Sequence, residues 1–337
     1  MAGNLSAKTN HVHAMKSRDF ARDILTHCYQ RTADNGVLFY SYSDYLEYFT
    51  LYCILARKYG IRVWEICLMP DHVHDAISSR TRNQRKDFKW EFNTRFSQQY
   101  NKRCGIKGPL LESPYGRAVK NGAKKARTNI IYIANNPVER QLVSKAEEYR
   151  WNFLAYAESD HPFSEKLVLR RARLPLQWAV KEVKSQYEKG NPLNYAMLQR
   201  MFSKLNKKES QQLTDFIVST YNVIDYSGVL ELFDGSYGAL LTAAHSTTGS
   251  EYDINESFLG KTDKPFATMS RILLEEAHLE DIHDFLSWTP SRRYELFLLL
   301  RRHMDVMGEQ IAKFLHLKIK KEVDRTTPLF WPSNGND

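Results

Sequence analysis

The first 160 residues alternate between strand-like and helix-like hydrophobic patterns, without a repeating strand–helix–strand period. Alternating apolar positions rich in β-branched residues favour strands, whereas apolar residues three and four apart favour helices that end at Gly or Pro. The predicted elements are a strand at 25–31, a helix at 44–59 with Ser41 or Ser43 as cap and Gly60 at its end, a strand at 61–69, a turn at Pro70-Asp71, a strand at 72–78, a basic helix at 86–103, and a helix at 121–136 that stops at Pro137. This mixture predicts an α+β fold for the first half of the chain.

The pattern changes near residue 160. It is largely helical and amphipathic at 163–200 and again at 266–323, and the stretch 228–262 is richer in Gly, Ser and Thr. Thr289-Pro290 is typical of a helix cap followed by proline at the first helical position. The predicted parts are a polar N-terminal arm (1–20), an α+β domain (21–158) and a mainly α-helical C-terminal region (159–337).

Two interpretations of residues 291–325 stay open. Gly308 separates two helical stretches, as in a helix-turn-helix that binds duplex DNA. The apolar positions with the spacing of its first half are Ile311, Ala312, Leu315 and Leu317. A plain helical bundle fits the same residues, because the later apolar positions match the motif imperfectly.

The positive charge is concentrated in one segment. The chain has 48 Lys and Arg against 39 Asp and Glu, a net charge of +9, and the excess lies between residues 80 and 127, interleaved with aromatic residues. Cations on phosphates and rings on bases make a nucleic acid the natural partner, whereas a solvated helix face over an aromatic core is the alternative. The residues predicted to bind DNA are Arg80, Arg82, Arg85, Lys86, Lys89, Trp90, Arg95, Lys102, Arg103, Arg117, Lys120, Lys124, Lys125 and Arg127.

Other classes are disfavoured by what the sequence lacks. No apolar run is long enough to cross a membrane, and the first 20 residues lack the apolar stretch of a secretion signal. The four cysteines are scattered without a CxxC pair, which excludes the common structural zinc patterns and argues against a disulfide framework. We expect a reduced, cytoplasmic, nucleoid-associated protein.

His72 and His74 form an HxH pair in the strand that follows the Pro70-Asp71 turn. Residues two apart in a strand project from one face, so both imidazoles point the same way while Asp75 points to the opposite face. Two imidazoles on one rigid face make half of a divalent-metal site. By itself the pair fits an ordinary packed strand equally well, and Asp71 is explained as a turn residue.

Tyr132 and Asn136 lie one turn apart on the helix predicted at 121–136, so both side chains share a face. A phenol can then point at a phosphate while the amide oxygen meets a metal. On its own the pair is more simply a core tyrosine and a C-terminal asparagine before Pro137.

Together the two motifs resemble a known family. WEICLMPDHVHDAIS, followed by YIANNPVERQLVSKAEEYRWNFLAY, is similar to the single-tyrosine HUH transposases, and to the REP-associated tyrosine transposases in particular. The resemblance covers roughly residues 25–157. Asp71 replaces the usual Asn, Asp75 a usual aliphatic residue, and Ala134 the usual His of the tyrosine motif.

The resemblance implies a ferredoxin-like antiparallel sheet with helices, the HUH nuclease domain. It also implies that His72, His74 and the Asn136 oxygen hold Mg²⁺ or Mn²⁺, and that Tyr132 is the nucleophile that forms a 5′-phosphotyrosine link. The expected substrate is single-stranded DNA beside a hairpin, with the C-terminal region as a candidate reader of the duplex stem. The protein would act as a monomer or a homodimer.

Two main functions therefore compete, and a hairpin RNA binder, which rests only on the charge and the aromatic rings, is a third possibility. The first is a metal-dependent single-stranded DNA transesterase, either a transposase or a domesticated recombinase. The second is a hairpin- or duplex-binding regulator that keeps the fold without cleaving. The set of His72, His74, Tyr132 and Asn136 favours the first, since a regulator has no use for a nucleophile and a metal together.

Overall fold

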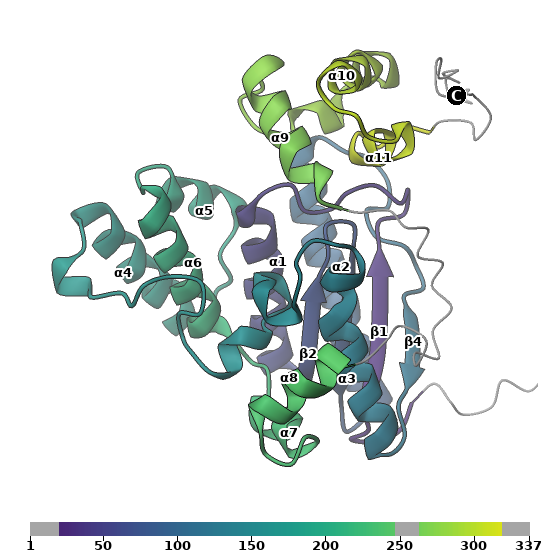
Figure 1. Ribbon diagram of the computed structural model, residues 1–337, viewed down its shortest axis with the longest axis vertical. Coiled ribbons are helices and arrows are strands. Elements are labelled where there is room, and N and C mark those ends of the chain that lie inside the picture. The colour runs from purple at the N-terminus through teal and green to yellow at the C-terminus, as the bar shows by residue number, and fades with distance from the viewer. Residues whose placement is uncertain (1–19, 247–262, 319–337) are drawn as a thin grey trace, which may run out of the picture.

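Four antiparallel strands form one sheet in the first half of the chain. The computed structural model describes residues 20–246 and 263–318 (Figure 1). The strands are β1 (Thr26–Arg31), β2 (Arg62–Leu68), β3 (His72–Ser78) and β4 (Gly116–Val119). The helices are α1 (Tyr42–Lys58), α2 (Arg82–Cys104), α3 (Ala123–Glu139), α4 (Leu174–Glu188), α5 (Tyr195–Phe202), α6 (Lys207–Tyr221), α7 (Tyr226–Glu231), α8 (Tyr237–Ser246), α9 (Pro265–Glu276), α10 (Pro290–His303) and α11 (Gly308–Phe314). Short 3₁₀ helices lie at Ala146–Glu148, Arg150–Asn152, Leu154–Ala157, Leu169–Arg171 and Asp284–Ser287.

The strand order is β2-β3-β1-β4, and every neighbouring pair is antiparallel. Combined with the chain order β1-α1-β2-β3-α2-β4, this is the ferredoxin-like arrangement. The α+β fold class predicted from the sequence is therefore confirmed, as is the mainly helical second half. β4 lies at one edge of the sheet, where it pairs with β1.

Both faces of the sheet are covered, and the strand alternation divides the core accordingly. Val73 and Ile77 of β3 belong to the cluster formed with α1 and α2, whereas Ala76 and the β2 residue Cys67 belong to the cluster formed with α3. Every residue of β3 is buried. Polar side chains on this strand are therefore held inside the protein rather than in water.

Two predicted helix boundaries were wrong by a few residues. α2 begins at Arg82 rather than 86, because Thr81 caps it: its hydroxyl accepts a hydrogen bond from the Gln84 amide at 3.1 Å. α3 runs through Pro137 to Glu139. Proline in the last turn removes only one backbone hydrogen bond, and the Arg140 amide continues the ladder to Asn136 at 3.0 Å.

The C-terminal helices pack directly on the α+β part. α5 and α6 lie beside α1, and α9, α10 and α11 gather at one end of the sheet (Figure 1). A single hydrophobic cluster extends from Cys28 of β1 to Leu315 at the end of α11. α10 begins at Pro290 behind a Thr289 cap, as predicted. The division at residue 158 stays a prediction.

Several predicted features fall partly outside the described residues. The N-terminal arm lies outside them except for Phe20, and so do residues 319–325 of the candidate helix-turn-helix. Ile311, Ala312 and Leu315 are buried in the core. Burial of these apolar residues fits a helix-turn-helix and a plain helical bundle equally, so the helix-turn-helix interpretation stays a prediction. All four cysteines are buried free thiols. None of the helices that the structure describes is long and apolar enough to span a membrane.

A buried histidine joins the C-terminal region to α1. His283 lies 3.0 Å from the Asp44 carboxylate and 2.5 Å from that of Asp281, and Arg103 of α2 meets Asp44 at 3.0 Å. Burial disfavours the charged imidazole, but the charge of Asp44, followed by the hydrogen bond that His283 donates to Asp281, outweighs it and raises the pKa of His283 to about 9.

This raised pKa predicts a pH-dependent stability. Because the pKa rises from 6.5 to about 9 on folding, the stabilisation is complete below pH 6.5 and is lost as the pH rises through about 9. We expect the free energy of unfolding to fall over this range by up to about 3 kcal/mol. Denaturant titrations at several pH values measure it in wild type and in His283→Gln. The same slope in both proteins would contradict the assignment.

Candidate active site

The two histidines of β3 share one face of the sheet, as the strand alternation predicts. Their ring centroids are 4.9 Å apart, and both side chains are almost fully buried. Tyr29 of β1 lies opposite His74 in the register, and its ring is 4.9 Å from His74 and 5.5 Å from His72. Asp75 points to the other face, where it pairs with Lys89 of α2.

Tyr132 approaches the same face from α3. Its ring lies 5.5 Å from His74 and 5.7 Å from His27 of β1, and the side chain is 1% exposed. Asn136 follows one helical turn later and is fully buried, and its amide nitrogen donates to the Tyr132 carbonyl at 3.0 Å. Two segments distant in sequence thus bring the predicted nucleophile next to one of the predicted ligands.

His27 is a residue of this cluster that the sequence analysis did not select. Its Nε2 lies 2.9 Å from Nδ1 of His74. Burial, followed by the charges of Lys120 and Lys89, lowers the pKa of His27 to about 3. Burial also lowers the pKa of His74, with smaller contributions from His72 and His27. Both rings are therefore neutral at pH 7, and one donates the shared proton to the other.

A signal for His27 was present in the sequence. The strand predicted at 25–31 alternates, so His27 and Tyr29 share a face. Pairing this strand with β3 places that face beside His72 and His74. The sequence did not reveal that β1 pairs with β3, because the choice of strand partners is not encoded in the local sequence.

Asp71 also does more than form a turn. Its Oδ1 lies 2.6 Å from Nδ1 of His72, and its Oδ2 meets the ammonium of Lys313 on α11. Burial alone would raise the pKa of Asp71, but His72 and Lys313 together hold it well below its usual range. The carboxylate is therefore ionised.

The donor atoms left over fit a divalent cation. Among the described residues, Nε2 of His72, Nε2 of His74 and Oδ1 of Asn136 are buried without a hydrogen-bond partner. Buried polar atoms without partners are rare, and an ion is one reason for them. The described residues hold no group of three or more His, Cys, Asp or Glu side chains suited to a metal. A cation here would therefore take two imidazoles and one amide, leaving positions open for oxygen ligands.

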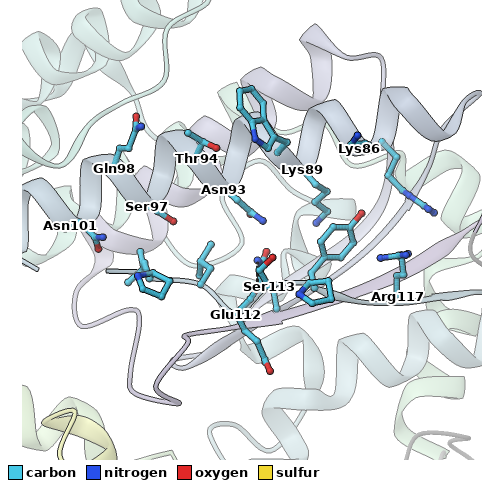
Figure 2. A pocket seen from close by; sticks show the side chains of 18 of the residues that line it. Lys86, Lys89, Asn93, Thr94, Ser97, Gln98, Asn101, Glu112, Ser113 and Arg117 are labelled. Carbon is cyan, nitrogen blue, oxygen red and sulfur yellow. Dashed lines mark hydrogen bonds between the residues drawn. The ribbon is translucent and has the colours of Figure 1, made fainter. Parts of the chain in front are cut away.

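Six of the residues predicted to bind DNA line one groove of about 700 Å³ between α2 and residues 108–117. They are Arg82, Arg85, Lys86, Lys89, Trp90 and Arg117. Figure 2 shows Lys89 and Asn93 pointing from α2 toward the segment that carries Glu112 and Ser113. Trp90 is 67% exposed, whereas Lys89 is buried against Asp75. The groove lies on the α2 side of the sheet, away from the histidines.

The other residues predicted to bind DNA are spread more widely. Arg103 is held by Asp44 and Glu47, each at 3.0 Å, and Arg95 pairs with Glu91. Lys120 follows β4 close enough to His27 to lower its pKa. The exposed cations of this set outside the groove are Arg80, Lys102, Lys124, Lys125 and Arg127.

No protein-family model and no curated protein matches the chain. A solved structure of a REP-associated tyrosine transposase bound to a REP hairpin is similar to it, with 14% sequence identity and a TM-score of 0.33. The similarity covers 40% of this chain and 79% of that chain. The roles of individual residues in this chain stay proposals.

The His27–His74 contact predicts that His27 supports metal binding without touching the metal. If Nε2 of His74 binds the cation, its Nδ1–H must donate to His27, and loss of such an outer partner typically weakens metal affinity about 10- to 100-fold. We expect this loss of Mn²⁺ affinity in His27→Phe, measured by calorimetry. Tyr115→Phe, a change of an aromatic side chain on the groove side, is the control. Unchanged affinity in His27→Phe would contradict the prediction.

Proposed function

We propose that the chain is a metal-dependent single-stranded DNA transesterase that cleaves beside a hairpin through Tyr132, as a transposase or a domesticated recombinase. The observation that carries the proposal is the packing of the Tyr132 ring against His74 and His27. Nε2 of His72, Nε2 of His74 and Oδ1 of Asn136, which follows Tyr132 by one helical turn, are buried without hydrogen-bond partners. The sequence motifs that hold these residues resemble those of the single-tyrosine HUH family.

The residues act in a single displacement. The Tyr132 oxygen attacks the phosphorus, a tyrosine–phosphorus bond forms, and the bond to the 3′-oxygen breaks. The phenol loses its proton and the leaving oxygen gains one, so a free 3′-hydroxyl and a 5′-phosphotyrosine result. The covalent link keeps the phosphodiester energy, and attack by another 3′-hydroxyl rejoins the strands. A bound Mg²⁺ or Mn²⁺ would supply Lewis-acid polarisation of the phosphate.

The protein's own side chains prepare this step. His72, His74 and Asn136 would hold the cation, and Asp71 and His27 would orient the two imidazoles through the hydrogen bonds described above. The lowered pKa of His74 suits this role, because a protonated ring has no lone pair to offer a cation.

The cationic groove gives the strand a route to the site. Arg117 on β4 faces the groove, and Lys120 lies just beyond the end of that strand, near His27. β4 is an edge strand, so a single strand bound in the groove would pass around this edge to reach Tyr132. Phosphates would lie on the cations, and a base would stack on the exposed ring of Trp90.

One observation favours the competing regulator. Tyr132, His72 and His74 are each at most 1% exposed, so a strand reaches them only after neighbouring side chains move. Tyr29, whose ring contacts both histidines, lines a nearby cavity of about 450 Å³. Cleavage therefore requires side chains around this centre to move, whereas a hairpin-binding regulator would leave the centre closed.

Covalent trapping decides between the two. With labelled hairpin-bearing single-stranded DNA and Mn²⁺, we expect an SDS-resistant adduct in wild type and none in Tyr132→Phe. Tyr29→Phe is the matched control, since its ring lies beside the same histidines, and it should still form the adduct. An adduct that survives in Tyr132→Phe but not in Tyr29→Phe would show that Tyr29 is the nucleophile instead. No adduct in any protein would favour the regulator.

The groove makes a separate prediction on binding. Stacking contributes about 1–3 kcal/mol per base, so Trp90→Ala should weaken single-stranded DNA binding roughly 5- to 150-fold. Trp178→Ala on α4 removes another exposed indole, 42% exposed, and should leave affinity unchanged. Fluorescence anisotropy measures both at one salt concentration. Equal effects of the two variants would place the DNA elsewhere.

A further inference from the structure

Lys313 of the C-terminal region contacts a residue of the candidate active site directly. Lys313 of α11 forms an ion pair with Oδ2 of Asp71, while Oδ1 of the same carboxylate lies 2.6 Å from Nδ1 of His72. The chain Lys313–Asp71–His72 thus joins residues 242 positions apart. His72 is the first residue of β3 and Lys313 lies on α11, and α9, α10 and α11 gather at one end of the sheet (Figure 1).

The position of Lys313 is fixed by its neighbours on both sides. The Val37 amide donates to the Lys313 carbonyl at 3.4 Å, and the Tyr40 hydroxyl donates to that of Phe314 at 2.8 Å. His316 contacts the Asp34 carboxylate at 2.6 Å and the Val37 carbonyl at 2.8 Å. α11 is therefore anchored to the loop after β1, and its lysine is aimed at Asp71.

The cavity of about 450 Å³ near the histidines is built from both halves of the chain. Tyr29, Asp71 and Arg140 line it from the α+β part, and Asp263 and Lys313 line it from the C-terminal part. Asp263 is almost fully buried, and its amide donates to the Arg140 carbonyl at 3.3 Å. The route toward His72 thus has a wall that residues before 160 do not supply.

We propose that Lys313 is a positioning residue of the active site, which holds the Asp71 carboxylate so that Asp71 fixes the His72 ring with Nε2 directed toward the cation. The presence of a cation rests on the proposed function, whereas the positioning role rests on the observed contacts of Asp71 with Lys313 and His72. A carboxylate that accepts from Nδ1–H selects the tautomer whose Nε2 carries the lone pair. Lys313 neutralises the buried carboxylate and prevents it from turning away. The C-terminal region is thereby a component of the catalytic centre.

Asp71 makes this dependence specific to this chain. The sequence motif resembles one in which Asn stands at that position, and an uncharged amide needs no ammonium to neutralise it. A double-mutant cycle exploits the difference, because two side chains that act through one contact are not additive. The variants are Lys313→Gln, Asp71→Asn and the combination of both, in the full chain.

The first readout is binding of Mn²⁺ alone, measured by calorimetry. We expect Lys313→Gln to weaken Mn²⁺ affinity about tenfold, as the loss of an outer-shell partner does, and Lys313→Arg to restore it. In the Asp71→Asn background Lys313→Gln should have less than about a twofold further effect. The matched control is Lys318→Gln, which removes an exposed lysine that lines the same cavity and should leave the affinity unchanged.

The second readout needs no metal. Nitrogen-15 shifts of the His72 ring report which nitrogen carries the proton, and we expect protonated Nδ1 in wild type and a mixture in Lys313→Gln. If wild type binds no Mn²⁺, the proposed function fails while this readout still decides the positioning role. An unchanged His72 tautomer in Lys313→Gln would overturn the proposal. So would a loss of Mn²⁺ affinity on Lys313→Gln that is equal in the wild-type and Asp71→Asn backgrounds.

Discussion

The contact between α3 and the histidine-bearing face of the sheet is the interaction on which the rest depends. Ile130 and Ile133 are fully buried in the cluster under α3, and their burial sets the helix so that the Tyr132 ring meets His74 and His27. The same burial removes water from the imidazoles and lowers the pKa of His27 and His74. Packing therefore delivers both the proximity of Tyr132 to His74 and the neutral state of His74 that the proposed binding of a cation requires.

Much of this arrangement could be predicted from local sequence, because strands and helices have fixed side-chain periods. The shared face of His72 and His74, the opposite direction of Asp75 and the pairing of Tyr132 with Asn136 on one helix face all follow from those periods. The start of α2 was misplaced because the Thr81–Gln84 cap precedes the apolar pattern. The end of α3 was misplaced because a proline in a last turn costs little. His27 was missed because which strands pair is a long-range property.

The packing of the second half of the chain on the first half could not be predicted from the sequence, for a different reason. Its polar contacts with the α+β part include single ion pairs, Asp44 with His283 and Asp71 with Lys313. Such pairs join residues more than 200 positions apart and leave no periodic signal. A helical pattern at 266–323 was therefore readable, whereas the docking of α11 beside His72 was not. The local cluster of cations and Trp90 along α2 was readable from the sequence, whereas the groove that these residues line was not.

The central claim is that His72, His74 and Asn136 surround one cation next to Tyr132. Anomalous diffraction from crystals soaked in Mn²⁺ tests it most directly, because the metal is located without any assumption about activity. The account predicts one strong peak within bonding distance, about 2.0–2.4 Å, of both Nε2 atoms and of the Asn136 oxygen. The absence of a peak at these three atoms at saturating Mn²⁺, with or without a peak elsewhere in the protein, would contradict the proposed cation site.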